Sequence, residues 1–400
     1  MKIFFSVGEP SGDLHGANLI RELRARRPEI EIVGYGGPKM AQAGCQLHED
    51  LTQLAFMWFA RVLLNLHRFY WLLRRARRYF REQQPDAVVL IDYPGFNWHI
   101  AKAAKREGIP VFYYGTPQLW AWASWRIKKM RRNVDHVLCN LPFEEPWYRQ
   151  QECHATYVGH PYFDELRSRK LDDRFMMHIQ QGQGPLVTIL PGSRAQEVTH
   201  NLRWFLKAAE IIRRQVPHVR FAVAAFNQSQ AQYARRQVEA TDLPMGVFVS
   251  RTPELIQAAD CCLAVSGSVS LELLYHTKPA VILYWINRPA YFVQGLFRKV
   301  KYITLANLLA SDDIHPSDLS PFDPNQADAA RVPYPEYLTC EDRSEQLAAH
   351  VREWLTDENC RRKRQALLGR LKDVTARTGA SWRTAEHILT ELEQPGRAAA

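Results

Sequence analysis

Two stretches of this chain combine residue types that could carry out chemistry. The first, Leu186–Val198, reads LVTILPGSRAQEV: an apolar run breaks at a Pro-Gly pair and continues in helix-forming residues. A buried strand that turns sharply into a helix points backbone N–H groups at an anion, and Arg194 adds a fork of donors that suits phosphate oxygens. The pattern predicts a phosphate site, although an ordinary strand–helix connection with a surface arginine has the same local sequence.

The second stretch is the apolar run that leads from Asp86 to Asp92 and continues as YPGFN. A carboxylate at the carboxyl end of a central parallel strand faces the crevice in which such sheets bind ligands. Asp92 is therefore a candidate general base, which would accept the proton of an attacking hydroxyl group. An aspartate that only caps a loop is the alternative.

Two further loops contain small residues that let a ligand approach the backbone closely. Gly8–Asp13 reads GEPSGD after the apolar run Lys2–Val7, and it lacks the GxGxxG spacing, so it does not imply a dinucleotide. Ser266–Ser270 follows the apolar run Cys261–Val265 and leads into a helix. Glu272 on that helix could accept hydrogen bonds from ribose hydroxyls, but a loop of this kind is a weak signal alone.

The elements that must position these residues form two series of alternating strands and helices, the second beginning at Leu186. We therefore expect an α/β fold of two Rossmann-like domains that face each other across a cleft. The expected domains are residues 1–165 and 185–355, with helices in 356–400 that pack back toward the first domain. The polar stretch Phe163–Gly184 is interpreted as the linker. Further strands are expected at Glu31–Tyr35, Pro110–Tyr114, Val134–Cys139, Thr156–Val158, Arg220–Ala225, Val247–Ser250 and Pro279–Trp285.

The composition is that of a globular protein with an anionic partner. The chain has 400 residues, which is too long for a single core, and a net charge of +10. Its seven cysteines are scattered, which favours a reducing compartment, and its first apolar run is too short for a signal peptide. We expect a cytoplasmic protein without a metal or other cofactor, because no Cys/His pattern has zinc spacing. Nucleic acid is not an expected partner, because no recognised binding module surrounds the basic clusters.

The segment Leu54–Arg81 has apolar residues at helical spacing, several tryptophan and tyrosine residues and no acidic residue. An amphipathic helix of this kind could lie on an anionic bilayer, or it could cover a sheet and expose a solvated basic face.

Two loops also differ from ordinary connections. Gly115–Trp122 is rich in tryptophan and suits an apolar or sugar ligand, while Ser311–Ala330 is acidic and proline-rich and is interpreted as a mobile surface loop.

In order along the chain, the motifs GEPSGDLHGANLI, GYGGPKM, IDYPGFN, PQLWAW, LPFE, VGHP, LPGSRAQEV, SGSVSLE and NLLA resemble those of the lipid-A-disaccharide synthases. The resemblance covers about Lys2 to Ala310. It implies the GT-B glycosyltransferase architecture and transfer from UDP-2,3-diacylglucosamine to 2,3-diacylglucosamine 1-phosphate. The implied product is the β(1→6) disaccharide with release of UDP, at the cytoplasmic face of the inner membrane and without a required metal; homodimers are possible.

The resemblance implies that Asp92 is the base on the acceptor 6-hydroxyl and that Arg194 contacts the UDP pyrophosphate. Since the anomeric carbon becomes cationic as UDP leaves, donors that stabilise the departing pyrophosphate would replace a metal, and a single in-line displacement predicts inversion. The predicted substrate-binding residues are Ser11, Gly12, Asp13, Asn97, Trp120 and Asn307. The predicted nucleotide-binding residues are Gly192, Ser193, Arg194, Ser266, Gly267, Ser268 and Glu272.

Four features depart from the family pattern. Trp58 replaces a glycine, Arg61 replaces a glutamate, Gly95 replaces an aspartate, and Ser311–Ala330 looks like an insertion. They leave two alternatives open beside the disaccharide synthase. One is a GT-B relative that uses a UDP-sugar with a different lipid acceptor or as an epimerase. The other is a non-catalytic, basic, membrane-binding protein.

Overall fold

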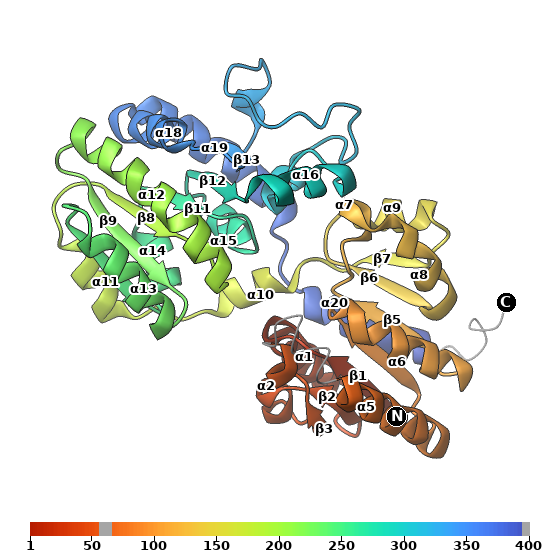
Figure 1. Ribbon diagram of the computed structural model, residues 1–400. Coiled ribbons are helices and arrows are strands. Elements are labelled where there is room, and N and C mark those ends of the chain that lie inside the picture. Colours follow the sequence, from red (N-terminus) through yellow and green to blue (C-terminus); the bar gives the residue numbers. More distant parts are fainter. Residues whose placement is uncertain (56–65, 394–400) are drawn as a thin grey trace. The chain divides into compact units, whose positions relative to one another are not determined.

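The computed structural model describes residues 1–55 and 66–393 of the chain (Figure 1). The chain forms two compact units. Unit 1 is Met1–Asp164 together with the described residues from Arg377 on, and unit 2 is Glu165–Ala376. The chain therefore enters unit 2 once and returns to unit 1 for its last helix, so the segment 356–400 is divided at Arg377.

Unit 1 is built on a seven-stranded sheet with the order β3-β2-β1-β4-β5-β6-β7, and every pairing in it is parallel. Its strands are β1 (Lys2–Val7), β2 (Glu31–Gly36), β3 (Gln46–Asp50), β4 (Ala87–Ile91), β5 (Val111–Tyr114), β6 (His136–Cys139) and β7 (Ala155–Tyr157). Its helices are α1 (Pro10–Arg26), α2 (Pro38–Gln42), α3 (Thr52–Ala55), α5 (Leu66–Gln83), α6 (Pro94–Arg106), α7 (Leu119–Trp122), α8 (Ile127–Asn133), α9 (Glu144–Gln150) and α20 (Ala380–Glu393), with a 3-10 turn at Ser124–Arg126.

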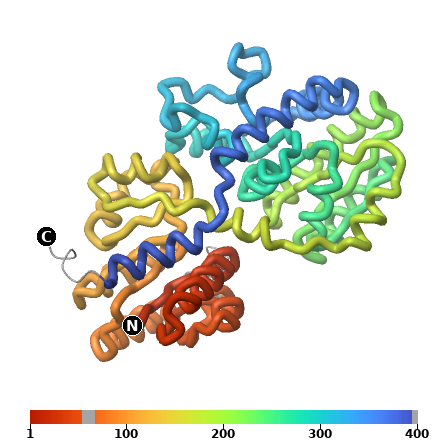
Figure 2. The backbone as a smooth tube through the Cα atoms, turned by 180° about the vertical axis from the view of Figure 1, so that it is seen from behind, coloured from red at the N-terminus to blue at the C-terminus, as the bar shows by residue number. Residues whose placement is uncertain are grey.

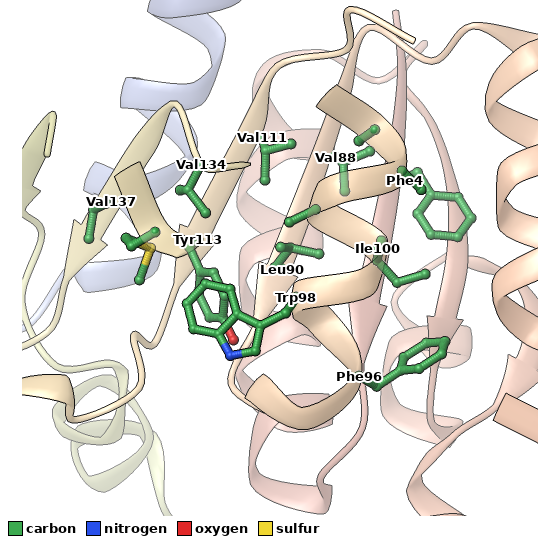
Figure 3. Packing of buried hydrophobic residues seen from close by; sticks show 14 of the residues in the cluster. Phe4, Val88, Leu90, Phe96, Trp98, Ile100, Val111, Tyr113, Val134 and Val137 are labelled. Carbon is green, nitrogen blue, oxygen red and sulfur yellow. The ribbon is translucent and has the colours of Figure 1, made fainter. Parts of the chain in front are cut away.

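Apolar side chains cover both faces of this sheet, as expected for parallel strands whose residues are buried on both sides. One face packs against α5, α6, α8 and α9, and the other against α1, α2 and α20. Figure 3 shows the first face, where Phe96 and Trp98 of α6 lie over the strands; Trp98 and Tyr113 of β5 approach to 5.6 Å between ring centroids. On the second face, α20 lies beside α1 (Figure 2).

Unit 2 is built on a six-stranded parallel sheet with the order β10-β9-β8-β11-β12-β13. Its strands are β8 (Leu186–Leu190), β9 (Arg220–Ala225), β10 (Met245–Val249), β11 (Cys261–Ala264), β12 (Ala280–Trp285) and β13 (Glu336–Thr339). Its helices are α11 (Asp173–Gln180), α12 (Ala195–Gln215), α13 (Gln228–Glu239), α14 (Thr252–Ala258), α15 (Val269–Tyr275), α16 (Arg288–Phe297), α17 (Leu305–Leu309), α18 (Ser344–Thr356) and α19 (Glu358–Thr375), with a 3-10 turn at Ala329–Arg331.

Two buried clusters again flank the sheet of unit 2. One joins the strands to α12, α13 and α18, and the other joins them to α11, α14, α15, α17 and α19. The order of strands in each unit reverses once, between β1 and β4 in unit 1 and between β8 and β11 in unit 2. Ligands of open α/β sheets bind beyond the carboxyl ends of the strands at such a switch point, so these two edges are where a site is expected.

The structure corrects the interpretation of Phe163–Gly184 and shows how Ser311–Ala330 is attached to unit 2. Phe163–Gly184 is not a plain linker, because it contains the end of α10 (Pro161–Ser168) and all of α11, and it buries Phe163, Met176 and Ile179. The loop Ser311–Ala330 has no strand and reaches the 3-10 turn only at its end, but Phe322 anchors it. The Phe322 ring packs 5.7 Å from the ring of Tyr337, between centroids, against the core of unit 2.

Part of the predicted amphipathic segment covers the sheet. Leu72, Ala76 and Phe80 of α5 are buried, whereas Tyr70 and Trp71 are 58% and 59% exposed. Residues 56–65, with Trp58 and Arg61, lie outside the described residues. Among the helices that the structure describes, none is both long and apolar enough to cross a membrane.

Candidate active site

The switch point of unit 1 brings the two predicted loops together. Val7 at the end of β1 is paired with Ile91 at the end of β4, so the chain leaves both strands side by side, into Gly8–Asp13 and into Asp92. Gly8 is needed here, because a Cβ atom on it would lie 2.2 Å from the Tyr93 ring. Asp92 and Gly8–Asp13 therefore belong to one edge of the sheet, as the sequence predicts.

The backbone of Asp92 is held in a strained conformation. Asp92 and Tyr93 have φ angles of 47° and 50°, in the left-handed region that non-glycine residues rarely occupy. The Asp92 carbonyl oxygen accepts hydrogen bonds from Asn97 Nδ2 (2.7 Å) and from the Tyr113 hydroxyl (2.8 Å). Strain of this kind persists only where the surroundings hold it, and it is common at active sites.

Asn97 is fully buried, and its side chain is engaged with the protein. Its Oδ1 accepts a hydrogen bond from the Ser6 hydroxyl (2.7 Å), and its Nδ2 donates to the carbonyls of Ser6 (3.1 Å), Ile91 (3.3 Å) and Asp92. The hydrogen bonds of Asn97 thus join β1, β4 and the Asp92 turn. Its predicted contact with substrate stays a prediction.

Asp13 has a similar supporting position. Its carboxylate is 2% exposed and accepts hydrogen bonds, each 3.0 Å long, from the backbone N–H groups of Gly37, Lys39 and Met40 at the start of α2. Asp13 therefore fixes the turn after β2 to the first turn of α1. The predicted loop Gly8–Asp13 is shorter than expected, because α1 begins at Pro10. Ser11 and Gly12 thus lie in the first helical turn, where Ser11 is exposed and Gly12 is buried, with Val7 Cγ1 2.8 Å from where a Cβ would lie.

In the tryptophan-rich loop, the predicted substrate-binding residue is buried, and other tryptophans are exposed. Trp120 is 1% exposed and donates from Nε1 to Glu144 (3.0 Å), whereas Trp122 and Trp125 are 47% and 56% exposed, with the Arg126 guanidinium over the Trp122 ring. Glu144 also accepts from the backbone N–H groups of Asn140 and Leu141. Burial raises the pKa of Glu144 to about 7.

Two histidines of this edge were not selected from the sequence. His15 on α1 and His160 after β7 approach to 6.5 Å between ring centroids. Burial lowers the pKa of His15 to about 4 and that of His160 to about 3, so both rings are neutral at pH 7. His15 Nδ1 is buried without a hydrogen-bond partner. The signal for them was their place in the motifs GEPSGDLHG and VGHP.

The switch point of unit 2 gathers the two predicted nucleotide loops. Leu190 at the end of β8 is paired with Ala264 at the end of β11. Gly192 has φ +116°, and a Cβ there would lie 2.6 Å from Glu197 Cβ, so a glycine is required at this turn. Val265, which follows β11, lies 3.2 Å from the same point, so the two loops meet here. Gly267 (φ +158°) has open space around its Cα, and Ser268 is exposed beside it.

Arg194 extends into solvent at the start of α12, with its side chain 78% exposed. The donors expected to meet an anion are held by Glu197. Its Oε2 accepts hydrogen bonds from the backbone N–H groups of Ser193 and Arg194 (3.2 Å each), and its Oε1 lies 3.3 Å from Arg194 Nη1. A carboxylate therefore takes the position at this helix start where the sequence predicts a phosphate.

Of the other predicted residues of unit 2, Glu272 and Asn307 are buried and Ser266 is partly buried. Glu272 is 3% exposed and is paired with Arg169 (2.6 Å). Asn307 is 1% exposed and donates to the Tyr334 carbonyl (2.9 Å) and to Glu336 (3.1 Å). The Ser266 hydroxyl donates to the Ile303 carbonyl (3.0 Å). These side chains hold the loops around the switch point, and their ligand contacts stay predictions.

A protein-family model described as lipid-A-disaccharide synthetase matches residues 3–369 of the chain. The chain belongs to this family. Curated lipid-A-disaccharide synthases share about a third of its residues over almost their full length. The one from Syntrophus aciditrophicus is 32% identical over 98% of both chains, and the one from Thiobacillus denitrificans is 33% identical over 97% of this chain and 99% of its own. The protein is thus a glycosyltransferase of lipid A disaccharide synthesis.

Solved structures confirm the GT-B architecture of this chain. A Staphylococcus aureus MnaA–UDP structure matches with a TM-score of 0.65 and 11% identity, over 98% of this chain and 97% of the other. A UDP-GlcNAc 2-epimerase from Neisseria meningitidis bound to UDP-GlcNAc matches with a TM-score of 0.62 and 12% identity, over 98% of this chain and all of the other. At such identities the likeness shows the fold alone.

Of the departures from the family pattern, Gly95 can be placed. It is exposed in the first turn of α6, and a Cβ built on it would meet nothing within 4 Å. The chain has room for an aspartate side chain at this position. The absence of that carboxylate is thus not a consequence of crowding.

Proposed function

We propose that the protein condenses UDP-2,3-diacylglucosamine with 2,3-diacylglucosamine 1-phosphate to the β(1→6) disaccharide 1-phosphate and releases UDP. The observation that carries the proposal is the Asp92 turn. A carboxylate at the carboxyl end of β4, on a left-handed backbone held by Asn97 and Tyr113, is a preorganised base at a ligand-binding edge. In the proposed reaction Asp92 takes the proton from the acceptor 6-hydroxyl as its oxygen attacks the anomeric carbon.

In this proposal unit 1 supplies the acceptor chemistry and unit 2 binds the UDP moiety. The exposed Arg194 guanidinium and the N–H groups at the start of α12 would stabilise the charge that develops on the departing pyrophosphate. These N–H groups are paired with Glu197, so the pyrophosphate would displace that carboxylate when it binds. Bond formation on one face and departure of UDP from the other make the proposed transfer inverting.

The test is to incubate the purified protein with both lipid substrates in detergent micelles and to identify products by mass spectrometry. The proposal expects UDP and the tetraacyl disaccharide phosphate in equal amounts, and at least about 100-fold less of both per unit time from Asp92→Asn. A folded protein that gives neither product would refute this pair of substrates.

Gly95 supports a second candidate, in which the same donor is used with a different lipid acceptor. The missing carboxylate lies three residues after Asp92, at the edge where the acceptor would bind. This candidate expects slow hydrolysis of the UDP-sugar without the disaccharide. If Gly95→Asp, for which there is space, raised disaccharide formation severalfold, the natural acceptor would differ from the one proposed.

We further propose that the protein binds the cytoplasmic face of the inner membrane as a peripheral protein. Helix α16 has no buried residue, and its Phe292, Val293 and Leu296 are 69%, 52% and 66% exposed. Arg288 and Lys299, at its two ends, are exposed as well. An apolar face flanked by cations suits an anionic bilayer. Unit 1 has exposed aromatics of its own, Tyr70 and Trp71 on α5.

Cosedimentation with phosphatidylglycerol-containing vesicles tests this membrane contact. The double change Phe292→Ser with Leu296→Ser should weaken binding by about tenfold or more, because two apolar side chains no longer enter the bilayer. Val374→Ser is the matched control, since Val374 is a 68% exposed apolar residue on α19. Unchanged binding of the double variant would exclude α16 as the contact.

A further inference from the structure

Three side chains with metal-binding atoms meet at the edge of unit 1 that lies opposite the candidate active site. His136 begins β6, whereas His387 and Glu391 lie one turn apart on α20. One ligand atom from each lies within 4.8 Å of the other two, and His136 Nε2 is 4.0 Å from Glu391 Oε2. Since Asp92 follows the carboxyl end of β4 and His136 begins a parallel strand, the cluster takes no part in the chemistry at Asp92.

The rings of this cluster have unused hydrogen-bonding capacity. His387 Nε2 is buried and has no hydrogen-bond partner. On His136 the nitrogen that faces Glu391 is Nε2, and the other ring nitrogen, Nδ1, is buried without a hydrogen-bond partner. Buried polar atoms are nearly always paired in proteins, so each such atom requires an explanation. The side chains of His136 and Glu391 are only 13% and 24% exposed, so the cluster is largely shielded from solvent.

The surroundings also resemble those of a built site. The Phe112 ring stacks on His136 at 4.5 Å between centroids, which fixes the plane of the imidazole. The nearby Asp135 carboxylate forms an ion pair with Lys105 (Nζ to Oδ1, 2.6 Å), so Glu391 is the carboxylate that faces the rings. His154 lies 4.8 Å from His136 and 6.4 Å from His387 between ring centroids, near enough to supply a further ligand.

We propose that His136, His387 and Glu391 bind a divalent first-row transition-metal ion of the Zn²⁺ class, with His154 or water as the fourth ligand. Imidazole and carboxylate at metal–ligand distances of about 2.0–2.2 Å suit this class, and tetrahedral ligands then lie about 3.4 Å apart. The observed separations need only rotation of the Glu391 side chain and small shifts of the rings. The ion would join the last helix to the sheet of unit 1, after the chain has returned from unit 2.

The test uses the full-length protein and Zn²⁺, in competition with a chromophoric chelator, with thermal unfolding measured in parallel. We expect one site per chain, and His387→Gln should weaken it by at least about tenfold because a direct ligand is lost. Zn²⁺ should raise the Tm of the wild type and not that of the variant, since only binding to the folded state stabilises it. His99→Gln, an exposed histidine on α6, is the matched control and should bind like the wild type.

Glu391→Gln guards against a variant that fails to fold, because Glu391 is partly exposed. It should fold, bind Zn²⁺ more weakly than the wild type, and change the visible spectrum of bound Co²⁺. The proposal is overturned if the wild type binds Zn²⁺ no more tightly than His387→Gln and Glu391→Gln do. It is equally overturned if His99→Gln loses as much affinity as they lose. Neither outcome bears on the proposed glycosyl transfer.

Discussion

The two switch points are built on the same strand topology, but their loops are held in different ways. In unit 1 the Asp92 turn has a left-handed backbone, and buried side chains such as Asn97 hold it. In unit 2 the corresponding loop exposes Arg194, and its N–H groups rest on the carboxylate of Glu197. In the proposed function, unit 1 therefore preorganises a base, whereas unit 2 keeps an anion site that a ligand completes.

The largest expected effect is that of Asp92→Asn. It removes the proposed base and leaves the shape of the turn, so kcat should fall by about 10²–10⁴-fold. Disaccharide formation under saturating substrates measures it. Asp86→Asn is the control at the opposite end of β4, where Asp86 accepts a hydrogen bond from the Lys2 N–H group. Equal losses in both variants would mean that Asp92 acts through stability.

Unit 1 has a second buried network, in which Glu144 accepts hydrogen bonds from Trp120 and from the N–H groups of Asn140 and Leu141. It should be visible in the pH dependence of the free energy of unfolding. Because burial raises the pKa of Glu144 from 4.5 to about 7, the folded state holds the proton more tightly than the unfolded state. The resulting stabilisation is complete below the unfolded pKa and is lost as the pH rises through 7. It amounts to about 3 kcal/mol.

Urea unfolding between about pH 4.5 and pH 8 measures this loss. Glu144→Gln should remove it, so the difference in unfolding free energy between wild type and variant should change across this range. Glu145→Gln is the control, because the neighbouring Glu145 is paired with Arg149 on the surface of α9. A wild-type pH dependence in Glu144→Gln would contradict the buried network.

In unit 2, Arg194→Gln should weaken UDP binding by about 10–100-fold, since a charge-assisted contact to the pyrophosphate is lost. Titration calorimetry with UDP measures the Kd. Arg214→Gln changes an exposed arginine near the other end of the same helix and should leave the Kd unchanged. A similar loss in both would indicate a general effect of positive charge.

The smallest effect is expected for Glu197→Gln. The carboxylate competes with the pyrophosphate for the N–H groups of Ser193 and Arg194, so its neutralisation should tighten UDP binding by about fivefold, or about 1 kcal/mol. Glu210→Gln, further along α12, is the control. Weaker binding by Glu197→Gln would show that the carboxylate takes part in the nucleotide site.

Much of the fold could be predicted, because the central strands are apolar runs bounded by breakers. β1, β8 and β9 have the predicted bounds, residue for residue. The edge strand β3 was missed because its sequence, QLHED, is polar and half-exposed, and β13 because it is short and lies beside prolines. In Phe163–Gly184 the glycines and glutamines at the end masked the helical pattern of α11.

The loops of the candidate site were also predictable, since glycines and a strand-end carboxylate mark them in the sequence. The hydrogen bonds within them were not, because the partners are far apart in the chain. Asp13 pairs with backbone groups that follow β2, and Asn97 with Ser6 of β1. Only the folded sheet shows that such residues hold the neighbouring loops by hydrogen bonds. Only the fold shows, too, that Trp122 is exposed and Trp120 is buried.

The most direct test of the difference between the two units is to measure both UDP affinity and turnover in Asp92→Asn and in Arg194→Gln. The account predicts that Asp92→Asn keeps the wild-type Kd for UDP within about twofold while turnover falls at least about 100-fold. Arg194→Gln should lose UDP affinity by at least about tenfold. If Asp92→Asn kept full turnover, or lost as much UDP affinity as Arg194→Gln, the assignment of the base to unit 1 would be contradicted.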